Sequence, residues 1–332
     1  MKTINVVLSG GVGSRLWPLS RKSCPKQYLP IFEGQTLFQK TIARNRALCD
    51  SLMVVGNKAN YELSRKDLKG LALDGFIEII EACPRNTAAA IAFAAFSANP
   101  EDILFVTPSD HLIDAEDNYL ESVKRAIELA QNGYIVTFGL KPTRPETGFG
   151  YIESKGEDVL SFREKPNLDT AEKFLKKGNF LWNSGMFCFK AGVFLEELKR
   201  YEPIVWEKSK EVIQASKEGF LDYDLSMEIP STSVDYAVME RTEKIKVVPS
   251  SFNWSDMGSF ESIFEYMTDH GYHADENGNM VIGTELYTEF VGMRDTMLIQ
   301  TKDAILVLQK EKAQDVKKVF EKLEKEKPEL VN

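Results

Sequence analysis

The stretch INVVLSGGVGSR, residues 4–15, decides the fold of this chain. Residues 4–8 form a short apolar run typical of a buried strand, and a glycine-rich turn follows directly. Such a turn lets backbone N–H groups close on phosphate oxygens without interference from Cβ atoms. It lacks the Gly-Lys-Ser/Thr ending of a Walker A loop, and Leu16 stands where the dinucleotide fingerprint needs its third glycine. The stretch therefore predicts a phosphate-binding loop and disfavours a nicotinamide cofactor, although a tight turn with surface Arg and Lys would share its glycines.

Further along the chain, apolar runs alternate with amphipathic stretches. The runs that indicate buried strands lie at residues 4–8, 52–55, 76–80, 103–107 and 134–138. After Gly148, shorter strands are expected at residues 151–153, 159–163 and 186–189, again between helices. Between these runs, alanine-rich residues 86–98 predict a buried helix with Asn86 or Thr87 as N-cap. The pattern predicts an α/β fold with a Rossmann-like, mixed, mostly parallel sheet flanked by helices.

Residues 269–278 are rich in Gly, Asp, His and Asn and mark the best domain boundary in the chain. Beyond them we expect short strands at 280–282, 296–300 and 304–308, followed by an amphipathic helix with Ala313, Val316, Phe320 and Leu323 on one face. The predicted domains are residues 1–268 and 269–332. The second has few apolar positions, so it is expected to dock on the first domain or on a second subunit.

Composition excludes several classes of protein. The 332 residues are 43% hydrophobic and 27% charged, with a formal net charge of −9, which argues against a nucleic-acid partner. No apolar run approaches the ~20 residues that cross a bilayer, and the N-terminus leads straight into a strand and turn instead of a signal peptide. The four cysteines and three histidines match no zinc spacing. We therefore expect a cytoplasmic protein with no membrane partner.

Several further motifs carry a resemblance to a known family. They are GGVGSRLWPLSR at 10–21 with PKQ at 25–27, RNTA at 85–88, PSDH at 108–111, PETGFGYI at 145–152, EKP at 164–166, WNSGMF at 182–187, SVDYAVME at 233–240 and WSDMGS at 254–259. In this order the motifs resemble the sugar-1-phosphate nucleotidylyltransferases, and LWPLSR at 16–21 points to the mannose-1-phosphate guanylyltransferase branch. Ordered motifs are more specific than one glycine loop.

The resemblance implies a fold, a reaction and partners. It implies a nucleotidyltransferase fold with a small β-rich C-terminal domain that ends in a helix and serves docking or dimerisation. The implied reaction joins GTP and α-D-mannose 1-phosphate to give GDP-mannose and diphosphate, by Mg²⁺-dependent in-line transfer in a homodimer. Many bacterial relatives carry a further C-terminal isomerase domain of about 100 residues, which has no room here, so a single activity is expected.

Asp110 follows the apolar run 103–107, so its carboxylate is expected at the carboxyl edge of the sheet, where open α/β folds bind ligands. Carboxylates suit Mg²⁺, which is a hard cation. The resemblance gives Asp110 and Asp256 as the metal ligands. If Asp110 instead only caps the turn that follows its strand, it holds no metal.

The resemblance also assigns the remaining site residues. Arg15, Lys26 and Asp110 are expected to be catalytic, with both cations on the triphosphate. The expected nucleotide contacts are Leu8, Gly10, Gly11, Gly13, Ser14, Asn86, Pro108 and Ser109. The expected sugar-phosphate contacts are Gly148, Tyr151, Glu164, Lys165, Asn183 and Asp235, where Asp235 could instead be a helix N-cap.

Two other interpretations remain open. The same fold could use a different nucleotide or sugar phosphate, because the guanine and mannose preferences rest on residues 16–21, Asn86 and Asn183 alone. The chain could also be a non-catalytic regulatory subunit that binds a sugar nucleotide. Retention of Arg15, Lys26, Asp110 and Asp256 argues against that second interpretation.

Overall fold

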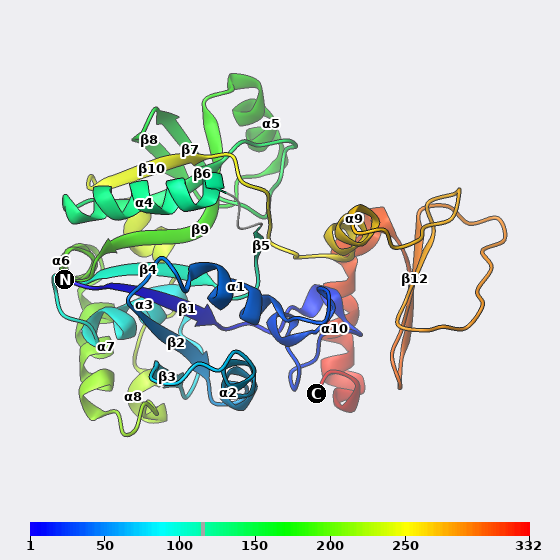
Figure 1. The fold of residues 1–332 in the computed structure, drawn as a ribbon, viewed down its shortest axis with the longest axis horizontal. Helices are drawn as coiled ribbons and strands as arrows, with labels where there is room; N and C mark the ends of the chain where they lie inside the picture. Colours follow the sequence, from blue (N-terminus) through cyan, green and yellow to red (C-terminus); the bar gives the residue numbers. More distant parts are fainter. Residues whose placement is uncertain (114–116) are drawn as a thin grey trace.

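The computed structural model describes residues 1–113 and 117–332 and is built on a sheet of nine strands (Figure 1). Their order is β3-β2-β1-β4-β9-β6-β10-β8-β7. The strands are β1 (Thr3–Ser9), β2 (Ser51–Asn57), β3 (Ile77–Glu81), β4 (Ile103–Pro108), β6 (Ile135–Leu140), β7 (Tyr151–Lys155), β8 (Asp158–Arg163), β9 (Phe180–Lys190) and β10 (Ile245–Ser250). The strands β1 to β4 are parallel, whereas β9 runs antiparallel between β4 and β6. The mixed, mostly parallel sheet predicted from the sequence is confirmed.

Helices cover both faces of this sheet because successive strand residues point to opposite sides. Val6 of β1 belongs to the same buried cluster as α3 and α6, whereas Val7 packs with Phe38 of α1. The helices of the main unit are α1 (Leu37–Asn45), α2 (Tyr61–Gly70), α3 (Asn86–Phe96), α4 (Asp117–Gln131), α5 (Leu168–Lys177), α6 (Ala191–Tyr201), α7 (Pro203–Ala215), α8 (Tyr223–Met227) and α9 (Phe260–Asp269). No helix within residues 1–113 and 117–332 is long and apolar enough to cross a membrane.

Helix α3 is the alanine-rich helix expected from the sequence, and its residues from Ala88 to Ala95 are all buried. Its N-cap is Arg85, so the prediction of Asn86 or Thr87 as N-cap was wrong. Asn86 instead begins the helix with a positive φ of 69°, and its side-chain oxygen accepts from the N–H of Thr87. This backbone conformation, which asparagine tolerates better than most residues, holds Asn86 at the carboxyl edge of the sheet.

The C-terminal unit forms a small sheet of β12 (Met280–Ile282), β13 (Thr296–Gln300) and β14 (Ile305–Gln309), followed by α10 (Val316–Glu326). The last strand lies one residue later than predicted. The unit lies at one end of the molecule, and α10 runs beside the blue segment that follows β1 and contains Ser14–Leu16 (Figure 1). Its apolar residues share one buried cluster with Leu16, Trp17 and α9, so it docks on the main unit of the same chain.

Candidate functional site

A cavity of about 460 Å³ opens at the carboxyl ends of β1, β3 and β4. The parallel topology explains the place, because the loops after these strands meet at one edge. Most of the predicted site residues line it, namely Leu8, Gly10, Gly11, Asn86, Pro108, Asp110, Gly148, Glu164, Lys165, Asn183, Asp235 and Asp256. A smaller hollow of about 260 Å³ adjoins it and is lined by Gly13, Ser14, Arg15 and Lys26, with Asp110 and Asp256 shared between the two.

The glycine loop after β1 requires its glycines. Gly11 and Gly13 have φ angles of 88° and 73°, in the left-handed region. A Cβ atom on Gly13 would lie 2.6 Å from the Cβ of Lys26, so only glycine lets the two backbones approach this closely. Ser14 to Leu16 then form a short 3₁₀ turn, and Arg15 Nη1 donates to the carbonyl of Gly258 at 3.5 Å. The loop, Arg15 and Lys26 therefore form one compact wall of the smaller hollow.

Lys26 links the two aspartates across that hollow. Its side chain is 7% exposed, and its Nζ lies 2.8 Å from Asp110 Oδ2. The same Nζ donates to the backbone carbonyl of Asp256 at 2.6 Å, while the Asp256 carboxylate accepts from the N–H of Gly258. Burial alone would raise the pKa of Asp110, but the pKa lies below its ordinary value, chiefly because of the charge and hydrogen bond of the neighbouring Lys26. Asp110 is thus held as a carboxylate that faces the site.

His111 stands beside this pair. Trp254 Nε1 donates to His111 Nδ1 at 3.2 Å, which leaves the ring proton of the neutral histidine on Nε2, 3.8 Å from Asp110 Oδ1. Burial lowers the pKa of His111 and so favours this neutral form. His111 therefore ties Trp254 to the loop after β4.

The two aspartates fit a magnesium ion only in partnership with substrate. Among residues 1–113 and 117–332, no group of three His, Cys, Asp or Glu side chains could hold a metal ion by itself. Asp110 and Asp256 both line the two hollows. Mg²⁺ is commonly held by one or two carboxylates together with phosphate oxygens and waters, so this donor set fits the ion when a triphosphate is bound.

Elsewhere on the wall of the larger cavity, a polar cluster brings together four of the residues that were expected to contact the sugar phosphate, namely Glu164, Lys165, Asn183 and Asp235. Lys165 Nζ lies 2.9 Å from Glu164 Oε1. Asn183 Nδ2 donates to Asp235 Oδ1 at 3.2 Å, and Asn183 Oδ1 accepts from Thr137 Oγ1 at 2.7 Å. The cluster presents carboxylate, amide and ammonium groups together, a combination that suits hydroxyls beside a phosphate.

Asp235 begins a π-helical turn, Asp235–Met239, and its N-cap is Val234. The alternative prediction that Asp235 is itself the N-cap was therefore wrong. Burial, and next the neighbouring Glu164 carboxylate, raise the pKa of Asp235 to about 7. Near neutral pH, part of the population therefore carries a protonated Asp235.

This raised pKa predicts a pH dependence of stability. Unfolded Asp235 ionises near its ordinary value of 3.8, whereas folded Asp235 stays protonated until about pH 7, so its contribution to stability falls as pH rises between these values. Asp235→Asn is expected to raise the free energy of unfolding by more than about 1 kcal/mol at pH 8, with a smaller difference at pH 5. Urea unfolding of both proteins at the two pH values measures this. An equal difference at pH 5 and pH 8 would contradict the assignment.

Two predicted site residues line neither the larger cavity nor the smaller hollow. Tyr151 was expected to contact the sugar phosphate, but it is fully buried and its hydroxyl accepts from the N–H of Glu146. It supports the 145–150 loop from behind because its place in β7 turns its ring into the core. Ser109 is also buried, and its N–H donates to the carbonyl of Leu8, which ties the loop after β4 to β1.

Glu81 is a site residue that sequence reasoning missed. It ends β3, lines the larger cavity and is only 7% exposed, yet its Oε1 has no hydrogen-bond partner among the residues that the structure describes. Burial raises the pKa of its carboxyl to about 8. The available signal was a carboxylate placed directly after an apolar strand and shortly before the RNTA motif, in the same way that Asp110 follows its strand.

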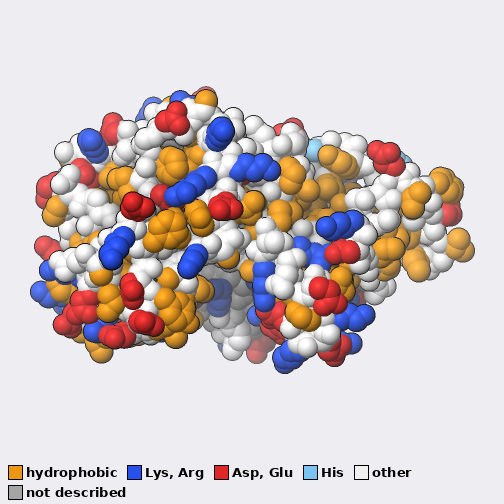
Figure 2. Space-filling view, turned by 90° about the horizontal axis from the view of Figure 1, so that it is seen from below, with side chains coloured by type: hydrophobic (Ala, Val, Ile, Leu, Met, Phe, Trp, Pro, Cys, Tyr) orange, Lys and Arg blue, Asp and Glu red, His pale blue; other side chains and the backbone are white. Residues whose placement is uncertain are grey.

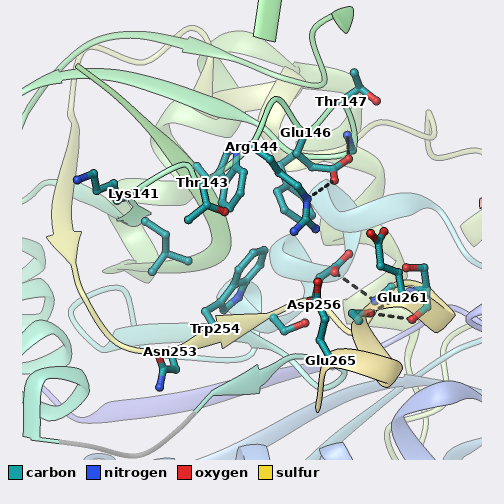
Figure 3. A pocket seen from close by; sticks show the side chains of 18 of the residues that line it. Lys141, Thr143, Arg144, Glu146, Thr147, Asn253, Trp254, Asp256, Glu261 and Glu265 are labelled. Carbon is teal, nitrogen blue, oxygen red and sulfur yellow. Dashed lines mark hydrogen bonds and ion pairs between the residues drawn. The ribbon is translucent and has the colours of Figure 1, made fainter. Parts of the chain in front are cut away.

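A wider hollow of about 820 Å³ adjoins this site (Figure 3). Arg144 and Glu146 on the 141–149 loop form an ion pair at 3.5 Å on one side, and Glu261 and Glu265 of α9 lie on the other. Asp256 lies between these two sides. The hollow shares Arg15 and Asp256 with the smaller hollow, so it offers a solvent-facing path to the glycine loop.

Comparison with known proteins shows the family to which this chain belongs. Residues 4–271 match the nucleotidyl transferase family model, and residues 273–323 match the model of the MannoseP isomerase/GMP-like beta-helix domain. The chain belongs to the nucleotidyl transferase family and is an enzyme of that class. Among its relatives is the mannose-1-phosphate guanylyltransferase of Escherichia coli K12, which is 40% identical over 97% of this chain and 73% of its own length.

Solved structures are also similar. One, described as the mannose-1-phosphate geranyltransferase of Thermus thermophilus, has a TM-score of 0.84 and 29% identity and covers 98% of this chain and 100% of its own. Another, described as the mannose-6-phosphate isomerase of Helicobacter pylori, has a TM-score of 0.71 and 38% identity, with 77% of this chain and 100% of its own covered. The predicted family is confirmed.

Proposed function

We propose that this enzyme transfers a guanylyl group from GTP to α-D-mannose 1-phosphate and releases diphosphate. One observation carries the proposal: the larger cavity joins the glycine loop and Asp110 on one wall to Glu164, Lys165 and Asn183 on the other. A nucleoside triphosphate and a sugar phosphate can therefore meet with reacting atoms in contact. The name of the Escherichia coli relative supports the choice of GTP and mannose.

Catalysis in this proposal is positioning and charge neutralisation. An anionic oxygen of mannose 1-phosphate attacks the α-phosphorus in line, and diphosphate leaves, so no general base is needed. Arg15, Lys26 and the loop amides bind the triphosphate, while Lys165 faces the phosphate of the sugar. Asp110 and Asp256 would hold Mg²⁺, which neutralises phosphate charge when bound.

Glu81 supports guanine as the base. The Watson–Crick edge of guanine presents two adjacent N–H donors, and a buried carboxylate with a free oxygen is their natural acceptor. These two donors favour the ionised form and so offset the raised pKa of Glu81. Adenine has an acceptor at the matching ring nitrogen, so it offers no donor there to an ionised carboxylate.

Glu81→Gln tests this assignment of the base. Loss of one charged acceptor is expected to lower the ratio of kcat/KM for GTP over ATP about 10- to 100-fold, since a bidentate pair is worth ~1–3 kcal/mol of discrimination. Initial rates with each nucleotide at saturating mannose 1-phosphate measure the ratio. Glu101→Gln, which changes a surface carboxylate paired with Lys190, is the matched control. An unchanged ratio in Glu81→Gln would place the base elsewhere.

The proposed reaction is tested by crossing nucleotides with sugar phosphates. Diphosphate release from GTP and mannose 1-phosphate should exceed that from every other pair of nucleoside triphosphate and sugar 1-phosphate. Better turnover with dTTP or ATP and glucose 1-phosphate would favour the other nucleotidylyltransferases. Absence of turnover with sugar nucleotide binding retained would favour the regulatory subunit. A parallel assay for isomerisation of mannose 6-phosphate tests for the activity that the description of the Helicobacter pylori structure names.

The assembly, the location and the division of the chain belong to the same proposal. The division falls between residues 1–268 and 269–332, the location is cytoplasmic, and the chain forms a homodimer.

Apolar side chains gather at the end of the molecule that the C-terminal unit forms (Figure 2). They include Leu286, Tyr287, Val291, Ile305 and Val307, all exposed. Sedimentation equilibrium should give a mass near twice 37.6 kDa, and Val307→Glu should reduce it.

A further inference from the structure

The segment that directly follows Arg15 is held by the C-terminal unit. Leu16 and Trp17 are buried in the same cluster as residues of β12, β13 and α10. Trp17 Nε1 donates to the carbonyl of Leu330 at 2.8 Å, although 313 positions separate the two residues. Arg21 Nη2 lies 2.7 Å from Asp303 Oδ1 in the turn between β13 and β14. These contacts place residues 16–21 at the interface between the two units, which we call the seam.

The same segment, residues 16–21, also contacts the glycine loop that follows β1. The carbonyl of Gly13 accepts from the N–H of Leu16 at 2.9 Å and from the Ser20 hydroxyl at 2.6 Å. The N–H of Lys26 donates to the carbonyl of Val12 at 3.2 Å, which ties the second cation to the same loop. The glycines have no side chains of their own to fix their conformation. Residues 16–20 and Lys26 therefore supply that restraint.

We propose that the C-terminal unit is a positioning element for the triphosphate, acting through Trp17 and Arg21 on the glycine loop and Arg15. The inference rests on the proposed function only in taking the loop to bind a triphosphate. Amides and cations stabilise transition-state charge only when they are fixed before the reaction, and small misplacements cost large factors in rate. Docking of the C-terminal unit onto residues 16–21 provides this rigidity.

The ion pair of Arg21 with Asp303 is the contact of this seam that a substitution can remove most selectively. Its side chain is 10% exposed, its Nε donates to the carbonyl of Pro18, and its charge faces Asp303. Asp303 itself is 36% exposed in a surface turn, so a change there does not disturb the core. Removing the charge of Asp303 leaves the buried guanidinium of Arg21 without an anionic partner. We therefore expect residues 16–21 to shift.

The test uses the full chain, and inorganic triphosphate is the probe. Asp303→Asn and Trp17→Phe are expected to weaken triphosphate binding in isothermal titration, and to reduce kcat/KM for GTP, by ~10-fold or more. The KM for mannose 1-phosphate should stay within about twofold because its wall of the cavity does not touch the seam. Asp303→Glu keeps the charge and should recover most of the affinity. Glu324→Gln is the control, since it removes only the exposed ion pair with Lys22 at the same interface.

The outcomes separate this inference from the proposed function. Triphosphate binding by Asp303→Asn and Trp17→Phe equal to that of the parent would overturn the inference, even if the thermal unfolding temperature fell. An equal loss for both substrates would also overturn it, because a general structural role would then suffice. If the parent protein binds triphosphate but forms no GDP-mannose, the proposed function fails while the positioning role is still measured by titration.

Discussion

Lys26→Met is expected to lower kcat by about 100-fold or more, since one charged contact to the transition state is worth ~3–4 kcal/mol. The Lys26 side chain is buried, and its Nζ contacts both Asp110 and the backbone of Asp256. The variant therefore removes a cation from the triphosphate site and also leaves Asp110 without its partner. Methionine keeps an unbranched apolar stem against Gly13, so packing of the loop is preserved.

Steady-state rates at saturating substrates measure this effect, and Arg15→Ala should show a loss of the same order. Lys190→Met is the matched control because Lys190 is a partly buried lysine in an ion pair with Glu101, at the far end of β9. Its rate should remain within about twofold of the parent. Near-normal rates for both Lys26→Met and Arg15→Ala would show that the glycine loop is not the phosphate site.

The second large effect concerns the two aspartates. Asp110→Asn and Asp256→Asn are each expected to lower turnover by ~100-fold or more and to weaken the dependence of the rate on Mg²⁺. Two carboxylates that face a triphosphate repel it unless a cation lies between them. Both residues line open hollows rather than the core, so circular dichroism of the variants should match the parent.

Rates measured across a range of Mg²⁺ concentrations test this prediction, with Asp158→Asn as the control on an exposed ion pair. A parent-like Mg²⁺ response in either variant would remove that aspartate from the metal site. The pairing of Asp110 and Asp256 on one ion has its own test in a structure with GTP and Mg²⁺. Carboxylates more than ~8 Å apart there would refute the pairing, since each ligand lies at ~2.1 Å from Mg²⁺.

The amino-acid sequence alone determined the fold class and most of the cavity wall. Apolar runs with strand periodicity, separated by amphipathic helices, predict a parallel sheet, and its carboxyl edge collects the loops that follow the strands. Gly11, Asp110 and Asn183 could be predicted to line the cavity because each lies in a short contiguous motif. Patterns of this kind depend only on residues that are close in the sequence, so they can be recognised without the tertiary structure.

Only the tertiary structure decided what depends on contacts between distant segments. Tyr151 belongs to a site motif but faces the core, because the pleat of β7 fixes which side each residue takes. Glu81 joined the site because the neighbouring strands bring its strand end to the cavity. The hydrogen bond from Trp17 to Leu330 depends on docking of two units, and no local periodicity encodes which apolar faces meet. The sequence therefore specifies the elements and their chemical groups, while long-range packing decides which of those groups share the cavity.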